Sequence, residues 1–174
     1  APVRNYMTSV FVSFLISLVP LDTKVSTWPL EGMNGELNNI AYMESYYGTY
    51  VNHEPHVRGA FHTAFGSLGL KPVTAHGQYL KSPKLQKQFP GLQNEQLFLQ
   101  EFWRNRLLYV QCANFHWYYL RSVTPTLARA VYSWRWGLTA SNTATDEQIA
   151  ADTYTTKYAE LTQRWIDSRT LSKR

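Results

Sequence analysis

A long amphipathic stretch between residues 95 and 120 constrains the fold most strongly. Asn94 is a residue type that caps helix N-termini, and the carboxylate of Glu95 suits the positive end of a helix. The pattern predicts one helix over about residues 95–120, and Pro125 prevents its continuation. The apolar side chains that recur at the spacing of one helix face are Leu99, Phe102, Trp103, Leu107 and Val110.

Two segments nearer the N-terminus carry the same kind of signal. Residues 35–47 place apolar groups at helical spacing up to Gly48, which is expected to stop that helix. Residues 57–68 are also predicted to be helical, with an apolar stripe of Val57, Phe61, Ala64, Phe65 and Leu68. The stretch up to residue 93 is predicted to be a loop, because it holds Pro72, Gly77, Pro83, Pro90 and Gly91.

The C-terminal segment is predicted to be the last helix. It begins at Thr145, because Thr145-x-x-Gln148 is a capping box, in which each of the two side chains satisfies the backbone N–H of the other residue. The residues expected on its inner face are Ile149, Tyr154, Tyr158, Leu161 and Trp165. The chain is therefore expected to be mainly α, with about four helices.

The N-terminal region is expected to add one short β-strand. Residues 10–19 (VFVSFLISLV) alternate with period two, which is typical of a buried strand. The run is about half as long as a membrane-spanning helix, so no transmembrane segment is expected. It could pass for the apolar part of a signal peptide, but no small-residue cleavage site follows before Pro20. With 174 residues, we expect a single domain over 1–174, with an N-terminal strand or arm over 1–34 and a helical core over 35–168.

Positive charge is concentrated in the middle of the chain. Residues 71–135 hold nine of the 17 Lys and Arg side chains but only two of the 12 carboxylates. Such a block could contact nucleic acid, an anionic surface or an acidic partner, or it could simply be a solvated face, which is the more frequent case. No nucleic-acid-binding motif accompanies it, so nucleic acid is not an expected partner.

The histidines give only a weak indication of a metal site. His53 and His56 flank Glu54 and Pro55, with His62 further along as a third candidate ligand. The two histidines are three residues apart rather than four, and Pro55 argues against a regular helix that would point both at one ion. A polar loop explains the cluster better, so no metal and no other cofactor are expected.

Cys112, the single cysteine, lies within the predicted long helix. At such a position a cysteine is most often a buried small apolar residue, and His116 one turn later is weak evidence for a nucleophile. In a secreted chain it would also suit an intermolecular disulfide.

Aromatic residues gather at 115–119 and 132–136, where core packing competes with a stacking platform for a ligand or partner. The candidate binding surface combines them with basic residues: Arg104, Arg106, Trp117, Arg121, Arg129, Trp134, Arg135 and Trp136.

Residues 89–98 (FPGLQNEQLF), followed by Phe102 and Cys112, resemble the C-terminal part of neprilysin-like zinc metallopeptidases. In that family a similar segment opens a helix that carries a cysteine. Residues 59–65 (GAFHTAF) resemble the family's helix of alternating small and aromatic residues, and residues 135–155 are similar in layout to its closing segment. The resemblance covers roughly residues 35–155.

The chain departs from this family at its zinc site. It has no HExxH motif, and the register of the resemblance places the family's glutamate ligand on Tyr50, which cannot replace a carboxylate. The family's terminal cysteine-containing tail is also missing. The resemblance further implies a disulfide from Cys112 to a distant N-terminal segment, and here the partner cysteine would lie on another chain or be missing.

These observations favour a secreted, non-catalytic neprilysin-like module that binds a protein partner or assembles with one. It would be either a degenerate relative or one piece of a processed precursor, because Ala1-Pro2 and Lys173-Arg174 resemble processed ends, although an arbitrary boundary of the chain would look the same. The alternative is a structural protein that self-associates through its aromatic and basic surface. An enzyme that uses His53, His56 and His62 with a metal has the least support.

Overall fold

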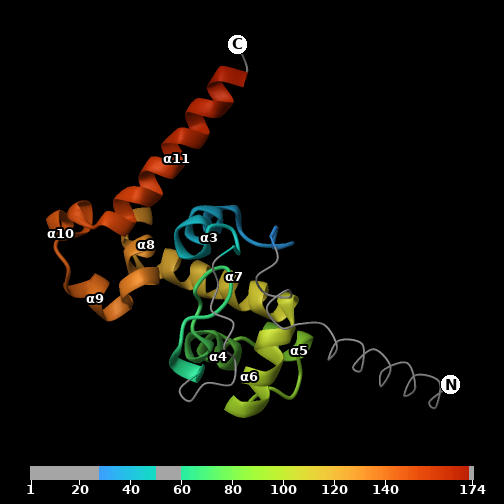
Figure 1. Ribbon diagram of the computed structural model, residues 1–174. Helices are drawn as coiled ribbons and strands as arrows, with labels where there is room; N and C mark the ends of the chain where they lie inside the picture. The colour runs from blue at the N-terminus through green and yellow to red at the C-terminus, as the bar shows by residue number, and fades with distance from the viewer. Residues whose placement is uncertain (1–27, 50–59, 173–174) are drawn as a thin grey trace.

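The computed structural model describes residues 28–49 and 60–172, and the prediction of a mainly α chain is confirmed (Figure 1). Within those residues there are nine α-helices rather than about four, and the predicted strand at 10–19 lies outside them. The α-helices are α3 (Asn38–Ser45), α4 (Pro72–Lys81), α5 (Pro83–Gln88), α6 (Glu95–Arg104), α7 (Arg106–Val123), α8 (Leu127–Trp136), α9 (Leu138–Thr143), α10 (Asp146–Ala151) and α11 (Thr153–Ser172). Two 3₁₀ turns, η1 (Gly35–Leu37) and η2 (Ala60–His62), complete the set.

Helix α7 lies at the centre of the molecule, and α4, α6 and α8 pack against it (Figure 1). Its buried residues include Leu108, Tyr109, Trp117 and Leu120, which face the surrounding helices. Burying each such side chain contributes about 1.5–3 kcal/mol, so α7 is a large contributor to core stability. In the described part of the chain, no helix combines the length and apolar character needed to cross a membrane.

The helix predicted over residues 95–120 is divided into α6 and α7 at Asn105. The backbone of Asn105 is extended there (φ −113°, ψ 96°), and its side chain accepts a hydrogen bond from the Leu108 N–H at 3.1 Å. Its amide also donates to Glu101 Oε1 at 2.9 Å. An asparagine competes in this way with the helical backbone, so it ends one helix and caps the next. The break places Leu107, expected in the apolar stripe, on the surface at 47% exposure.

The helix predicted over residues 57–68 is wrong for its described part, residues 60–68. After η2 the chain turns back on itself, and the backbones of Phe65 and Leu70 exchange two hydrogen bonds of 3.1 Å. Gly66 and Gly69 allow this turn because both have positive φ. Phe65 and Leu68 are nevertheless buried, so the apolar pattern identified buried residues without identifying their backbone conformation.

The loop predicted up to residue 93 contains two helices, α4 and α5. Pro72 and Pro83 lie in the first turns of these helices, where a missing N–H costs nothing. Ser82 caps α5 by accepting from the Leu85 N–H at 3.1 Å. Pro72 and Pro83 therefore begin helices, while Pro90 lies in a turn.

The predicted capping box at Thr145 and Gln148 is confirmed, with bonds of 2.8 and 3.1 Å. The segment nevertheless forms two helices, because Asp152 ends α10 and accepts from the Thr155 N–H and hydroxyl. Tyr158 is buried as expected, but Trp165 is 60% exposed because α11 extends away from the other helices (Figure 1).

Candidate functional site

Two of the eight candidate surface residues have a structural role near Glu36. Trp117 is fully buried, and its indole N–H donates to Glu36 Oε1 at 3.3 Å. Arg121 Nε lies 3.6 Å from the same oxygen. These two contacts attach α7 to the η1 turn, and Trp117 belongs to the core rather than to a binding surface.

Arg129 is also structural. Its side chain is only 16% exposed, and its guanidinium donates to the carbonyls of Ser141 at 2.5 Å and Ala144 at 2.9 Å. It also pairs with Asp146 at 2.9 Å. Arg129 thus fastens α9 and the start of α10 to α8.

Arg104 and Arg106 lie at the junction between α6 and α7. Arg104 pairs with Glu101 three residues earlier at 3.5 Å, on a partly exposed helix face. Neither arginine lines the pocket described next.

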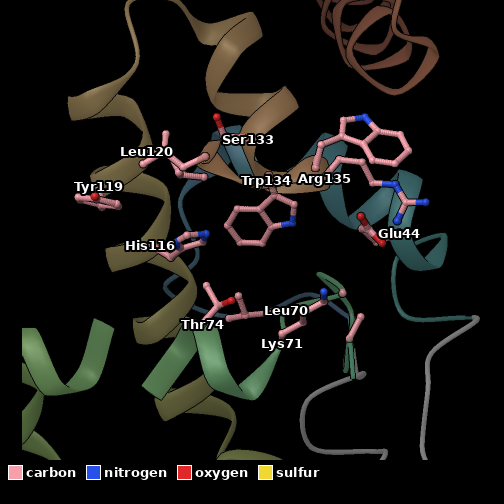
Figure 2. A pocket seen from close by; sticks show the side chains of 15 residues that line it. Glu44, Leu70, Lys71, Thr74, His116, Tyr119, Leu120, Ser133, Trp134 and Arg135 are labelled. Atoms are coloured by element: carbon pink, nitrogen blue, oxygen red, sulfur yellow. The ribbon is translucent and has the colours of Figure 1, made fainter. Parts of the chain in front are cut away.

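Trp134, Arg135 and Trp136 meet at one pocket, with a volume of about 340 Å³. Figure 2 shows side chains entering it from α3, from the start of α4, from α7 and from α8. The volume is within the range of small-molecule and peptide side-chain sites. Its other lining residues are Glu44, Ala64, Gly69, Leu70, Lys71, Thr74, His116, Tyr119, Leu120, Ser133, Gly137 and Leu138.

Trp134 forms a fixed wall of the pocket. Its indole N–H donates to the carbonyl of Leu68 at 3.2 Å. Its ring centroid lies 5.3 Å from that of His116 and 6.1 Å from that of Trp117. Anchored at both edges, the indole offers an ordered aromatic surface instead of a mobile one.

His116 is a neutral group on the α7 side of the pocket. Burial, with the nearby charge of Lys81, lowers its pKa to about 4. The Gln78 amide N–H₂ lies 3.2 Å from Nδ1, and because that group can only donate, Nδ1 accepts and Nε2 carries the proton. At neutral pH the ring is therefore a polar but uncharged part of the lining.

Glu44 and Arg135 lie near each other on the side of the pocket opposite His116 (Figure 2). The hydroxyl of Tyr154 donates to Glu44 Oε1 at 2.8 Å. Burial raises the pKa of Glu44, while the Tyr154 hydrogen bond and the charge of Arg135 act in the opposite direction. The guanidinium of Arg135 lies 5.1 Å from the Trp136 ring and 5.9 Å from the Tyr154 ring. Among the described residues Glu44 and Arg135 do not form a salt bridge, and Lys71 is a second cation in the lining.

The histidine candidates do not assemble into a metal site in the described part of the chain. His53 and His56 lie outside that part, and His62 on η2 packs edge-to-face against Phe61. No group of three His, Cys, Asp or Glu side chains among residues 28–49 and 60–172 could hold an ion. Metal binding by these histidines therefore gains no support.

Cys112 is completely buried in α7, and burial strongly raises the pKa of its thiol. A buried, protonated thiol is a poor nucleophile and a poor partner in disulfide exchange. The environment favours a small apolar core residue over an intermolecular disulfide.

The sequence did not single out the polar pocket residues Glu44 and Thr74, nor the contact that Tyr154 makes to Glu44 from outside the lining. Glu44 is a polar residue in helix α3 that carries no motif, and its hydrogen-bond partner Tyr154 lies 110 residues away. Nothing in the local sequence pattern could have joined them. Lys71 belonged to the basic block, but its spacing did not distinguish it from the other lysines there.

No protein family model, curated protein or solved structure matches the chain.

Proposed function

We propose that this chain is a secreted, non-catalytic, neprilysin-like module that binds a protein partner at the pocket between α4, α7 and α8. The partner would place a peptide segment against Trp134 and Trp136, with Arg135 between them in sequence as the charged contact. The module would work as one part of a larger assembly. The neprilysin-like part of this proposal rests only on the sequence resemblance of residues 35–155.

The observation that supports a binding role most is the convergence of these three neighbours on one cavity. Trp and Arg are enriched among the residues that dominate binding energy at protein interfaces, especially around a pocket. Trp136 is 52% exposed, although its indole N–H is held by Asp152 at 3.0 Å. An exposed but anchored indole loses little entropy on binding, which favours association.

A selection from a displayed random peptide library on the folded chain would test this function. Enriched peptides are expected to bind the wild type and to be displaced from it by one another, because they share one pocket. The substitutions Arg135→Gln and Trp136→Ala should lower the affinity of these peptides, whereas Arg104→Gln should leave it unchanged. Arg104 is a suitable control because it carries the same charge on a helix surface away from the pocket.

Self-association through the same surface is the alternative. It predicts that the apparent mass in sizing or sedimentation experiments rises with concentration, and that Trp136→Ala abolishes the rise. A monomer at all concentrations, combined with selected peptides that respond to pocket variants, would leave a foreign protein as the partner. Selected peptides that bind all variants equally would remove the pocket from the proposal.

A further inference from the structure

The charged residues of the pocket have a positive balance. Lys71 and Arg135 line it together with the carboxylate of Glu44, which gives two cations against one anion. Lys81 adds positive potential nearby, because its Nζ lies 5.4 Å from the ring centroid of Tyr119, another lining residue. This field favours an anionic ligand over a cationic one.

The guanidinium of Arg135 packs against aromatic rings and has no hydrogen-bond acceptor among the described residues. The rings of Trp136 and Tyr154 flank it at 5.1 and 5.9 Å. Across residues 28–49 and 60–172, no oxygen accepts a hydrogen bond from it or pairs with it. A guanidinium packed on aromatic faces keeps the N–H donors at its edge, in the planar fork that matches a carboxylate.

Glu44 does not take up these donors, because its own position is fixed by other neighbours. Tyr154 holds Oε1 at 2.8 Å, and Gly69 lies so close that an added Cβ would be 2.5 Å from Oε2. The charges of Glu44 and Arg135 still interact, since burial raises the pKa of Glu44 and the charge of Arg135 offsets part of that rise. The charge of Glu44 therefore attracts the guanidinium without taking up its N–H donors.

The rest of the pocket is suited to an apolar group. Trp134 and the neutral ring of His116 form the aromatic part. The aliphatic part of the lining consists of Leu70, Leu120 and Leu138. A ligand that fits both parts carries an anionic group next to an apolar or aromatic one.

We propose that the pocket recognises a carboxylate attached to an apolar or aromatic residue of a peptide. Arg135 is its main partner, Lys71 is the second cation, and Trp134 packs against the apolar part. This inference rests on the proposed function, since it names the chemical group by which the protein partner is held. A peptide C-terminus and an Asp or Glu side chain would both supply the carboxylate.

Three acetylated dipeptide probes separate these cases in an NMR titration of the full chain. The first, N-acetyl-Ala-Phe, has a terminal carboxylate, and the second is its C-terminal amide. The third, N-acetyl-Asp-Phe amide, carries only a side-chain carboxylate. Binding is followed by the indole N–H signals of Trp134 and Trp136, which Trp→Phe variants assign.

A carboxylate-bearing probe is expected to shift both indole signals in a saturable manner, and the second probe should bind about tenfold more weakly, the usual effect of losing a charge-assisted hydrogen bond. The first and third probes show which source of carboxylate is preferred. For the better-binding of these two probes, Arg135→Gln should lower the affinity by about tenfold and Lys71→Gln by about threefold. Arg104→Gln should leave it unchanged. Lys71 is exposed, so its variant keeps the test valid should Arg135→Gln fail to fold.

Equal binding of the amide probe would overturn the carboxylate assignment but leave peptide binding at the pocket intact. Unchanged binding by both Arg135→Gln and Lys71→Gln would also overturn it. If none of the probes moved the two indole signals, the assignment would fall, while the library selection described above would still decide the broader function.

Discussion

The Tyr154 hydroxyl donates a 2.8 Å hydrogen bond to Glu44 Oε1 and so joins α11 to α3 across 110 residues of chain. Two further residues hold α11 near α3: Asn39 donates to Thr162 Oγ1 at 2.9 Å and to the Tyr158 carbonyl at 3.4 Å, and the Tyr158 hydroxyl donates to the Glu36 carbonyl next to α3. The contact from Tyr154 therefore both fixes the carboxylate at the pocket and helps to hold α11 against the core.

Replacement of Glu44 by glutamine should change the pH dependence of stability. Burial raises the pKa of Glu44 above its ordinary value of 4.5, so the native state binds this proton more tightly than the unfolded chain. The group then favours folding below pH 4.5, and this contribution is lost as the pH rises through the folded-state pKa. Glu44→Gln should therefore gain stability relative to the wild type as the pH rises from below to above 4.5.

Urea unfolding of both proteins across this range measures the difference. Asp167→Asn on the exposed part of α11 is the matched control, since this carboxylate is outside the pocket. A constant difference between Glu44→Gln and the wild type at all pH values would contradict the raised pKa.

Gly66→Ala is expected to destabilise the fold by about 2–4 kcal/mol. Its Cβ would lie 2.6 Å from the hydroxyl oxygen of Tyr109 and would require φ +77° from an alanine. That hydroxyl donates to the Phe65 carbonyl at 2.7 Å and accepts from the Leu68 N–H at 3.0 Å, so displacing it breaks two buried hydrogen bonds.

Gly91→Ala separates the two causes in the same unfolding experiment. Gly91 also has a positive φ of +83°, but no atom lies within 4 Å of an added Cβ, so only the backbone cost of about 1–2 kcal/mol remains. Equal losses for the two variants would show that Tyr109 adjusts freely.

Arg129→Ala should cost about 2–4 kcal/mol of stability, because the guanidinium satisfies the carbonyls of Ser141 and Ala144 and pairs with Asp146. Arg104→Ala should stay within about 0.5 kcal/mol, as is usual for an exposed ion pair. Thermal or urea unfolding checks both values. If Arg129→Ala lost partner binding but kept its stability, Arg129 would be a binding residue instead of a structural one.

The thiol of Cys112 is expected to react with an aromatic disulfide reagent only when the chain opens. It is fully buried and its pKa is strongly raised. The reaction should therefore be slow in buffer and rapid in denaturant. The native protein should show no disulfide-linked dimer that a reductant dissociates. Rapid labelling of the folded protein, or a reductant-sensitive dimer, would support the hypothesis of an intermolecular disulfide through Cys112.

The sequence predicted the helical class because the apolar periodicity of α6, α7 and the C-terminal helices reflects real burial. It misplaced boundaries where a polar side chain competes with the backbone, as at Asn105, or where prolines begin helices, as at Pro72. The failure over residues 60–68 has another cause. Gly66 and Gly69 build a tight turn that buries the same side chains a helix would have buried.

The candidate site was predicted only in part. The aromatic cluster at residues 132–136 drew attention to Trp134, Arg135 and Trp136, and these three do share a pocket. Composition could not separate them from Trp117 and Arg129, whose similar side chains serve the core and the helix junctions. Glu44 could not be found at all, because only the packing of α3 against α11 brings it to the site.

The most direct test of a binding role for this pocket is the affinity of a library-selected peptide for matched variants. Trp136→Ala or Arg135→Gln should reduce the affinity by about 30-fold, which corresponds to a binding hot spot of about 2 kcal/mol, and Arg104→Gln should leave it unchanged. Circular dichroism verifies that each variant is folded. Affinities that are equal for the wild type and all three variants would contradict the pocket as the binding site.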